Sequence, residues 1–364
     1  MATELGKAMA DKGHKVHFIT YNRPFRLDHY HENIYYHEVN VPDYPLFEHL
    51  PYETALAGKL VDVTRFDNLD LVHVHYAIPH ASAALFAKNI LAESGKSLPV
   101  ITTLHGTDIT LVGRDNTYAP VVEYSINKSD GVTAVSKSLK EETEEFFNIK
   151  REIEVIPNFI DFTRFSKLDK DHFKKAIAPN DEKILIHVSN FRKLKRVDDV
   201  IRVFNGVRKE IPCKLLLAGD GPERANIETL CRNSEYTDDI RFLGKQEAIE
   251  ELLAVSDLFI MPSASESFGL AALEGMACRV PLISSNIGGL PEINIHGKTG
   301  FLSDLSDAED MTRNALLLLK DDDKLNEFKE QAYLQARKFD IETVMPVYEK
   351  YYEKVIQDSK SNAK

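Results

Sequence analysis

Short apolar runs alternate with amphipathic stretches along the first half of the chain. The runs are rich in β-branched residues and too short for buried helices, so they are typical of strands. The strands expected from them are His14–Thr20, Ile34–Val39, Leu71–Tyr76, Val100–Leu104, Gly131–Val135 and Ile153–Ile156. Helices are expected between them, for example at Ala81–Ala92 and Leu139–Phe147. Ser138 and Glu141 would form a capping box at the start of the second helix. This alternation predicts a parallel sheet with helices on both faces.

A polar stretch from Asp161 to Glu182 interrupts the pattern, and we interpret it as a connection between two domains. Beyond it, strands are expected at Ile184–Val188, Lys214–Ala218, Arg241–Leu243, Leu258–Met261 and Val280–Ser284. The last part of the chain predicts helices, most clearly at Ile341–Ile356. The sequence therefore predicts two doubly wound α/β domains that face a cleft, where ligands usually bind. We expect the first domain to span residues 1–162, with the C-terminal helix 341–364 packed back on it, and the second to span 163–340.

The beginning of the chain departs from this plan. Met1–Lys7 is already helix-like, and Lys15–Thr20 is the first visible strand. Because a doubly wound domain usually opens with a strand and a loop, we expect that one interior strand and its Gly-rich loop are missing from this sequence. The strand would lie beside Lys15–Thr20 and Leu71–Tyr76, so two ladder edges would be open. The alternative is a fold that begins with a helix.

Composition and charge narrow the function. The chain has 364 residues, which fits two domains, and its 45 basic and 57 acidic residues give a net charge of -12. Nucleic-acid binders normally carry a basic footprint, so that partner is disfavoured. The three cysteines form no CxxC pair, which disfavours a disulfide framework and a structural zinc site. The sequence has neither a membrane-length apolar segment nor a signal-like start, so we expect a protein of the reducing cytoplasm without a membrane partner.

Basic residues are nevertheless concentrated in one loop. Ser189–Arg196 carries Arg192 and Lys195 between an expected strand and an expected helix. A loop that leaves the carboxyl end of a parallel strand and enters a helix is a common anion site. Arg192 could hold a phosphate through two hydrogen bonds, and Lys195 could add a point charge. A solvated basic turn is the alternative.

Glycine turns and one histidine mark other strand ends. Gly219 and Gly221 would let a ligand approach the backbone, although a plain tight turn explains them as well. The chain lacks the GxGxxG and GxxxxGK[ST] patterns, so dinucleotide and P-loop sites are excluded by pattern. His105 is a further candidate because Gly106 follows it at a strand end, where a cleft is expected.

The segment Pro262–Glu274 is the most informative part of the chain. Glu266 and Glu274 stand eight positions apart, with Phe268 and Gly269 between them. If a helix begins at Phe268 or Gly269, its free N–H groups could face a diphosphate or a sugar. The two glutamates would then lie near the same helix face, where one could bind sugar hydroxyls and the other ribose hydroxyls. Two solvated glutamates are the alternative.

In combination, these motifs resemble a known family. Glu266–Glu274 matches an E-x7-E motif, and it occurs together with Gly219–Glu223, Gly288–Glu292 and Gly297–Phe301. The set resembles the retaining glycosyltransferases of family four, which have the GT-B fold. The resemblance covers nearly the whole chain. It implies an enzyme that transfers a hexosyl group from a UDP-sugar.

A narrower resemblance lies within this family. His73–His80, Thr103–Thr110 and Ser189–Arg196 are similar to the members that transfer N-acetylglucosamine from UDP-N-acetylglucosamine to L-malate. That transfer is the first step of bacillithiol biosynthesis. The resemblance implies UDP-N-acetylglucosamine and L-malate as substrates and no metal or other cofactor. It leaves open whether the chain forms a homodimer.

The resemblance also assigns roles position by position. Arg192 and Lys195 match the cations that bind the donor diphosphate and stabilise the departing UDP, and Glu266 and His105 match groups beside the donor sugar. These four are the expected catalytic residues. The other expected donor contacts are Asn190, Gly219, Gly221, Gly244, Lys245, Ser267, Phe268, Gly269, Leu270 and the ribose-binding Glu274. The expected acceptor contacts are Tyr76, Thr103 and Thr107.

Two departures qualify the resemblance. First, the family's N-terminal strand and Gly-rich loop would precede Thr3, and neither is in this sequence. Second, Asn190 stands where many members carry a basic residue, and we expect Arg192 to supply that charge. We therefore expect the chain to bind UDP but to transfer sugar poorly. The alternatives are a family-four transferase with a lipid or polysaccharide acceptor, a sugar-nucleotide epimerase of the same architecture, and a truncated, non-catalytic UDP-sugar-binding protein.

Overall fold

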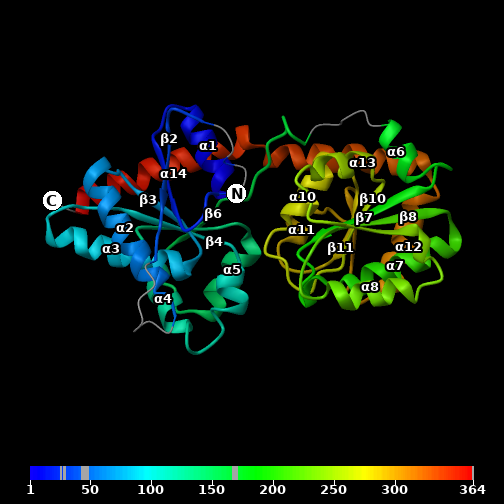
Figure 1. Ribbon diagram of the computed structural model, residues 1–364, viewed down its shortest axis with the longest axis horizontal. Coiled ribbons are helices and arrows are strands. Elements are labelled where there is room, and N and C mark those ends of the chain that lie inside the picture. The colour runs from blue at the N-terminus through cyan, green and yellow to red at the C-terminus, as the bar shows by residue number, and fades with distance from the viewer. Residues whose placement is uncertain (25–26, 28–29, 42–48, 166–170, 363–364) are drawn as a thin grey trace. The chain divides into compact units, whose positions relative to one another are not determined.

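The computed structural model describes residues 1–24, 27, 30–41, 49–165 and 171–362 (Figure 1). The chain divides into two compact units. The first unit combines Met1–Asn158 with Glu342–Lys364, and the second is Phe159–Ile341. Each unit is an α/β domain with parallel strands, as the alternating pattern predicts. Among the described residues, every helix is too short or too polar to cross a membrane.

The second unit is built on a six-stranded sheet in which all neighbouring strands run parallel. Its strands are β7 (Lys183–Ser189), β8 (Cys213–Gly219), β9 (Ile240–Gly244), β10 (Leu258–Met261), β11 (Leu282–Ser285) and β12 (Gly300–Ser303). Its helices are α6 (Asp171–Ile177), α7 (Val197–Glu210), α8 (Arg224–Arg232), α9 (Ile249–Val255), α10 (Leu270–Ala277), α11 (Leu290–Ile293), α12 (Ala308–Leu319) and α13 (Asp322–Ala336). Short helical turns are η3 (Lys193–Lys195), η4 (Thr237–Asp239) and η5 (Arg337–Phe339).

Helices cover both faces of this sheet. Phe204 of α7 and Met311 of α12 share a core cluster with Ile260 of β10. On the opposite face, Gly275 of α10 lies against Phe259 of β10. Because both faces are buried, β10 is apolar at every position and does not alternate with polar residues.

The first unit contains two separate sheets. A four-stranded parallel sheet has the order β3 (Val72–His75), β4 (Val100–Leu104), β5 (Gly131–Ala134) and β6 (Ile153–Val155), and a two-stranded parallel sheet joins β1 (Val16–Thr20) and β2 (Ile34–Glu38). The helical elements are α1 (Ala2–Asp11), α2 (Tyr52–Asp67), η1 (Ala77–Ala81), α3 (Ser82–Glu93), η2 (Thr107–Leu111), α4 (Ala119–Lys128), α5 (Lys137–Phe146) and α14 (Ile341–Asn362). Leu60 of α2 and Leu91 of α3 share a core cluster with Val74 of β3. Tyr351 of α14 bonds to the backbone of Val132 on β5, so the last helix also packs on this sheet.

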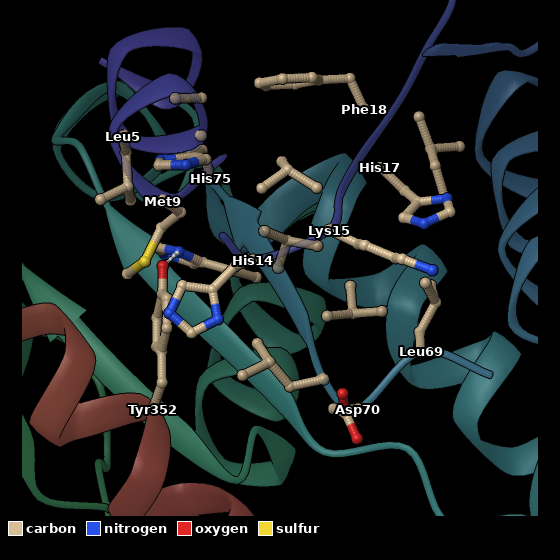
Figure 2. Close-up of a pocket in the computed structure, with 18 of the residues that line it drawn as sticks. Leu5, Met9, His14, Lys15, His17, Phe18, Leu69, Asp70, His75 and Tyr352 are labelled. Atoms are coloured by element: carbon tan, nitrogen blue, oxygen red, sulfur yellow. Dashed lines mark hydrogen bonds between the residues drawn. The ribbon is translucent and has the colours of Figure 1, made fainter. Parts of the chain in front are cut away.

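A cavity of about 640 Å³ lies in the first unit between β1 and β3 (Figure 2). Among the described strands, β1 pairs only with β2 and β3 only with β4, so each has one open edge. Residues of both strands line the cavity, together with Leu5 and Met9 of α1 and Tyr352 of α14. In Figure 2, His17 and Phe18 lie across the cavity from Tyr352. The open ladder edges expected from the sequence are therefore present in the described strands.

Two local expectations differ from the structure. Gly300–Ser303 forms the edge strand β12, which is not among the strands expected from the sequence. Four residues beside a Gly-rich turn are too short a pattern to indicate a strand. The cap of α5 is Ser136, whose hydroxyl accepts a hydrogen bond from the Leu139 N–H at 3.1 Å. Ser138 is not the cap, because the helix already begins at Lys137.

The segment expected to connect the domains belongs instead to the second unit, as far as it is described. The chain passes between the units at residues 158–159 and 341–342, and residues 166–170 lie outside the described part. Ile160 pairs with Asp340, and Arg164 forms an ion pair with Glu250 at 2.9 Å. The polar composition predicted a linker, but these polar groups are used in contacts within the unit.

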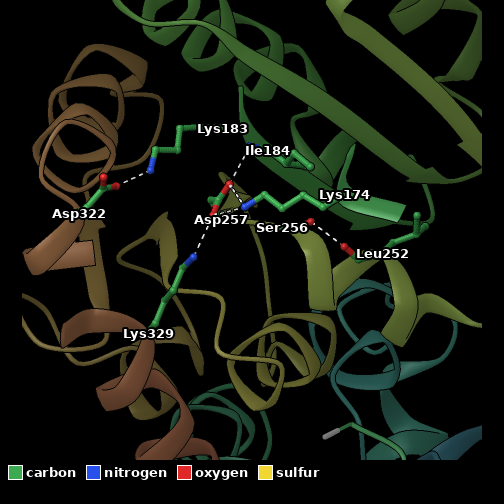
Figure 3. A network of polar contacts seen from close by, with 8 residues as sticks. All are labelled: Lys174, Lys183, Ile184, Leu252, Ser256, Asp257, Asp322 and Lys329. Carbon is green, nitrogen blue, oxygen red and sulfur yellow. Dashed lines mark hydrogen bonds and ion pairs between the residues drawn. The ribbon is translucent and has the colours of Figure 1, made fainter. Parts of the chain in front are cut away.

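Asp257 is the centre of a network of polar contacts at the amino end of β10 (Figure 3). Its carboxylate accepts hydrogen bonds from the Ile184 N–H at 3.0 Å, from Lys174 at 3.2 Å and from Lys329 at 2.8 Å. Burial by itself raises the pKa of Asp257, but the two lysines outweigh it and the pKa is lowered. The network joins α6 and α13 to the sheet at its amino edge.

Candidate functional site

The carboxyl ends of the parallel strands in the second unit collect the expected donor residues. Asn190 and Arg192 follow β7, Gly221 follows β8, Lys245 follows β9, and Glu266 follows β10. The strand order β12-β11-β10-β7-β8-β9 places β7 beside β10. The chain builds the sheet in one direction from β7 and in the other from β10. Open α/β sheets bind ligands at such a reversal of strand order, at the carboxyl edge.

A buried histidine positions the loop after β7. His187 is fully buried, with Nδ1 2.8 Å from the Ile260 oxygen of β10 and Nε2 2.8 Å from Ser189 Oγ. Ser189 Oγ also accepts a hydrogen bond from the Phe191 N–H at 3.3 Å. Burial lowers the pKa of His187 to about 4, so the ring is neutral near pH 7. The sequence analysis missed His187 because its partner strand comes more than seventy residues later.

The two expected phosphate-binding cations have different surroundings. The Arg192 side chain is exposed and has no hydrogen bond or ion pair to another described residue. Lys195 Nζ lies 2.5 Å from Glu266 Oε2, and the two side chains are 17% and 15% exposed. Beside this ion pair, the Ala264 N–H donates to the Leu194 oxygen at 2.7 Å. The structure therefore brings the loops after β7 and β10 together, with the Arg192 guanidinium available to an anion.

The glycines after β8 allow two loops to touch. A Cβ at Gly219 would lie 1.8 Å from the Ser189 oxygen, and a Cβ at Gly221 would lie 1.8 Å from the Asn190 oxygen. Gly219 also has a φ of +125°, which side chains disfavour. The close approach that these glycines allow is thus between the β8 loop and the cationic loop. Larger residues here would displace Asn190.

Helix α10 begins too late for both glutamates to share a helix face. It starts at Leu270, so Glu266 lies in the preceding loop and only Glu274 is on the helix. The expectation of one shared helix face is therefore wrong. Gly269 is the N-cap with a φ of +92°, and no side chain caps the first turn. The first N–H groups of α10 therefore have no partner within the helix.

The loop between β10 and α10 is anchored on both sides. The Phe268 side chain is buried and makes an edge contact with Phe339 at 5.6 Å, so only its backbone could meet a ligand. The Gly289 N–H donates to the Glu266 oxygen at 2.9 Å. Ser267 and Leu270 are partly exposed beside these anchors.

Gly244 and Lys245 stand apart from these loops. They follow the edge strand β9, which is two strands away from β7. Lys245 is exposed. The structure places both residues at the same sheet edge but outside the contact between Lys195 and Glu266.

A row of histidines crosses β3 and β4 in the first unit. His75 Nδ1 lies 2.8 Å from His105 Nε2, and His73 Nε2 lies 2.6 Å from Thr103 Oγ1. The Tyr76 ring lies 5.0 Å from the His105 ring. Burial lowers the pKa of His73 and of His105 to about 3, and that of His75 well below its ordinary value. The rings are therefore neutral near pH 7, so they offer hydrogen bonds rather than positive charge.

Asp108 shapes the loop after β4, and the sequence analysis did not single it out. Its carboxylate accepts hydrogen bonds from the N–H groups of Ala77, Gly106 and His105 at 2.9, 3.0 and 3.3 Å. The pKa of Asp108 is raised, because the effect of burial is larger than the opposite effect of these hydrogen bonds. An Asp two residues after a glycine at a strand end was an available signal. The loop leaves Thr107 exposed.

The side chain of Thr103 is fully buried, and Oγ1 lies 2.6 Å from both His73 Nε2 and Thr133 Oγ1. In this structure the Thr103 side chain supports the histidine row, so the expected acceptor contact stays a prediction without support from its surroundings. Tyr76, with 38% of its surface exposed, and Thr107 are both exposed to solvent.

Two family models match the chain, one on each half. The model for Glycosyltransferase Family 4 matches residues 1–164, and the model for Glycosyl transferases group 1 matches residues 169–335. Among curated proteins, the N-acetyl-α-D-glucosaminyl L-malate synthase of Bacillus anthracis is 45% identical over 99% of this chain and 94% of its own length. An uncharacterized glycosyltransferase of Methanocaldococcus jannaschii is 29% identical over 93% of this chain and 90% of its own.

Solved structures share the fold at low sequence identity. HepE of Anabaena, in complex with UDP and glucose, has a TM-score of 0.82 at 18% identity and covers 96% of this chain and 94% of its own. Sucrose-phosphate synthase of Thermosynechococcus elongatus has a TM-score of 0.81 at 20% identity and covers 98% and 93%. The chain therefore belongs to the glycosyltransferases of family four, and its fold is GT-B, with two Rossmann-like domains.

Proposed function

We propose that the chain transfers N-acetylglucosamine from UDP-N-acetylglucosamine to L-malate with retention of the anomeric configuration. The observation that carries the proposal is the 45% identity to an N-acetyl-α-D-glucosaminyl L-malate synthase over 99% of the chain. Identity over nearly the full length includes both the donor half and the acceptor half of the enzyme. It disfavours a lipid or polysaccharide acceptor and a non-catalytic binding protein.

The donor half of the proposed site lies in the second unit. Arg192 and Lys195 hold the diphosphate, and Glu274 accepts hydrogen bonds from the ribose hydroxyls. Lys195 is already paired with Glu266 at 2.5 Å, so a bound phosphate shares this lysine and leaves Glu266 positioned toward the sugar. Support comes from the gathering of these loops at the reversal of strand order, and from HepE, whose solved complex contains UDP.

The acceptor half lies in the first unit. Tyr76 and Thr107 are exposed at the carboxyl ends of β3 and β4, and His105 lies between their strands with a neutral ring. A neutral imidazole is suited to hydrogen-bond a hydroxyl without attracting a phosphate. The role of His105 is therefore to orient a hydroxyl of the sugar or of malate.

The chemistry requires little covalent participation from the protein. The bond between the anomeric carbon and the UDP oxygen breaks, and charge develops on the departing phosphate. Cations already in place stabilise that charge without reorganisation. Retention then follows if malate attacks from the side that UDP leaves and a phosphate oxygen takes the hydroxyl proton. Because Arg192 and Lys195 carry the leaving-group charge, we propose that transfer needs no metal.

Product analysis tests the proposal. Purified chain is incubated with UDP-N-acetylglucosamine and L-malate, and the product is examined by mass spectrometry and by proton NMR of the anomeric signal. We expect an α-linked N-acetylglucosaminyl malate, formed equally with and without EDTA. Reactions without malate, with a lipid acceptor and with a polysaccharide acceptor are the controls. Product only with one of those acceptors, or an epimerised free sugar, would contradict the proposal.

A further inference from the structure

Two histidines and one aspartate converge on the two-stranded sheet of the first unit. His17 lies on β1, His37 on β2, and Asp67 is the last residue of α2. In the parallel register His17 is opposite Tyr35 and His37 is opposite Ile19, so both imidazoles project from the same face. His17 Nδ1 lies 2.9 Å from His37 Nε2 and 3.7 Å from Asp67 Oδ2. One ligand atom from each residue lies within 4.8 Å of the other two.

We propose that His17, His37 and Asp67 bind a divalent transition-metal ion of the zinc type, with the fourth position open to solvent. Two imidazoles and one carboxylate are a donor set that suits zinc, whereas magnesium and calcium prefer oxygen ligands alone. Bonds of about 2.0 Å in a tetrahedron place neighbouring ligand atoms about 3.3 Å apart. The observed separations of 2.9 and 3.7 Å lie on either side of that value, so small side-chain rotations suffice.

The surroundings of the three groups fit an ion that is held but exchangeable. The His17 side chain is 7% exposed and the Asp67 side chain 38%, so the site is closed on one side and open on the other. The imidazole nitrogens of His17 and His37 and a carboxylate oxygen of Asp67 lie close enough together to bind one ion. The positive charges of Lys15 and Lys59 act on these histidines as well. Because those charges oppose a cation, we expect moderate affinity.

Such an ion would join the paired strands β1 and β2 to the end of α2. A two-stranded sheet is marginally stable by itself, and the other edge of β1 faces the cavity. A metal bound by β1, β2 and α2 would clamp this sheet to the helix beside it. His17 and Asp67 also line the cavity, and Figure 2 shows the His17 side chain there. The proposed transfer uses none of the three residues, so the clamp is structural.

Metal titration of the full chain tests the proposal. Chelator-treated protein is titrated with Zn²⁺ in a calorimeter and with Co²⁺ in a spectrometer, and the melting temperature is measured with and without Zn²⁺. We expect one equivalent to bind, a visible Co²⁺ spectrum of low coordination number, and a higher melting temperature with Zn²⁺. The variants His37→Gln and Asp67→Asn should each weaken Zn²⁺ binding at least tenfold.

The matched control is His31→Gln. His31 lies 3.2 Å from Asp11 and forms another histidine–aspartate pair in the same unit, so its loss should leave Zn²⁺ binding unchanged. Absence of binding to the unaltered chain would overturn the proposal, as would equal losses in His31→Gln and His37→Gln. Should circular dichroism show that His37→Gln is unfolded, Asp67→Asn decides, because its side chain is partly exposed and keeps its size.

Discussion

Arg192 and Lys195 are three residues apart in one loop, but a bound phosphate would interact with them differently. The Arg192 guanidinium is exposed and has no described partner, whereas the Lys195 ammonium is partly buried against Glu266. Arg192 gains a partner when the phosphate binds. Lys195 already forms an ion pair with Glu266 and would share its charge between Glu266 and the phosphate. The contribution of Lys195 to phosphate binding therefore depends on the position of Glu266.

Replacement of either cation by alanine should lower turnover. Both would stabilise charge that develops on the departing UDP, and loss of one preorganised electrostatic partner typically costs about 10² to 10³ in kcat. Steady-state kinetics of Arg192→Ala and Lys195→Ala measure this effect. Lys193→Ala is the matched control, because Lys193 is an exposed cation of the same turn. Equal turnover in all three variants and the unaltered chain would remove the phosphate assignment.

Glu274 should control affinity for the donor rather than for malate. A carboxylate accepts hydrogen bonds from two ribose hydroxyls, and glutamine keeps the shape but weakens both bonds. Glu274→Gln should therefore raise the KM for UDP-N-acetylglucosamine more than the KM for malate. Equal increases in the two KM values would instead indicate a packing role for Glu274 in α10.

At the scale of elements, the histidine row depends on a helix from the other end of the chain. His73 Nδ1 lies 2.6 Å from the Tyr352 hydroxyl of α14, and its Nε2 bonds to Thr103 of β4. The row thus couples two strands and one helix through neutral rings. Their burial makes this part of the fold sensitive to acid.

The free energy of unfolding should decrease as the pH is lowered below about 6.5, which is the ordinary pKa of histidine. Burial lowers the pKa of His73 and His105 to about 3, so between these pH values the unfolded chain binds more protons than the folded one. Each such histidine contributes a slope of about 1.4 kcal/mol per pH unit in that window. The stabilisation is fully present above pH 6.5 and is lost as the pH falls toward 3.

Denaturant unfolding of His73→Gln between pH 7 and pH 4.5 measures one part of this slope. Unfolding of the variant should take up one proton fewer, so its free energy of unfolding should depend less steeply on pH. His14→Gln is the control, because the His14 side chain is 60% exposed. Identical slopes for His73→Gln and the unaltered chain would show that His73 is not the group responsible.

Two strands that were predicted from the sequence with the observed bounds are buried on both faces, and they are Val100–Leu104 and Leu258–Met261. The first is rich in β-branched residues and the second is apolar at every position, and both patterns are typical of strands. The roles of Asp108 and His187 were missed, because each depends on neighbours that only the folded sheet supplies. The burial of Thr103 was missed for the same reason, because its sequence position at a strand end does not reveal which neighbours cover its side chain.

At the scale of the whole molecule, one unit is formed by a single segment of the chain and the other by two segments. The second unit is one uninterrupted segment, Phe159–Ile341, whereas the first needs Glu342–Lys364 in addition to Met1–Asn158. Helix α14 supplies Tyr351, whose hydroxyl lies 2.8 Å from the Val132 nitrogen and 3.1 Å from its oxygen. Without α14, this face of the four-stranded sheet is uncovered.

The two units should therefore differ when produced separately. A chain of residues 159–341 should fold, melt cooperatively and bind UDP, because its core and its donor residues are complete. A chain of residues 1–158 should not melt cooperatively until the segment 342–364 is added. Circular dichroism and calorimetry measure both results. Cooperative melting of residues 1–158 alone would show that α14 is dispensable for the first unit.

The discontinuity of the first unit has a consequence for synthesis on the ribosome. Translation proceeds from the N-terminus, so Met1–Asn158 emerges first but waits for the last 23 residues before it is covered. The second unit emerges later and is complete earlier. We therefore expect the reverse of the usual order, in which the N-terminal domain folds first. While translation continues, the nascent chain exposes the apolar surface that α14 will cover. Early release or stalling within α14 would expose that surface to chaperones and proteases.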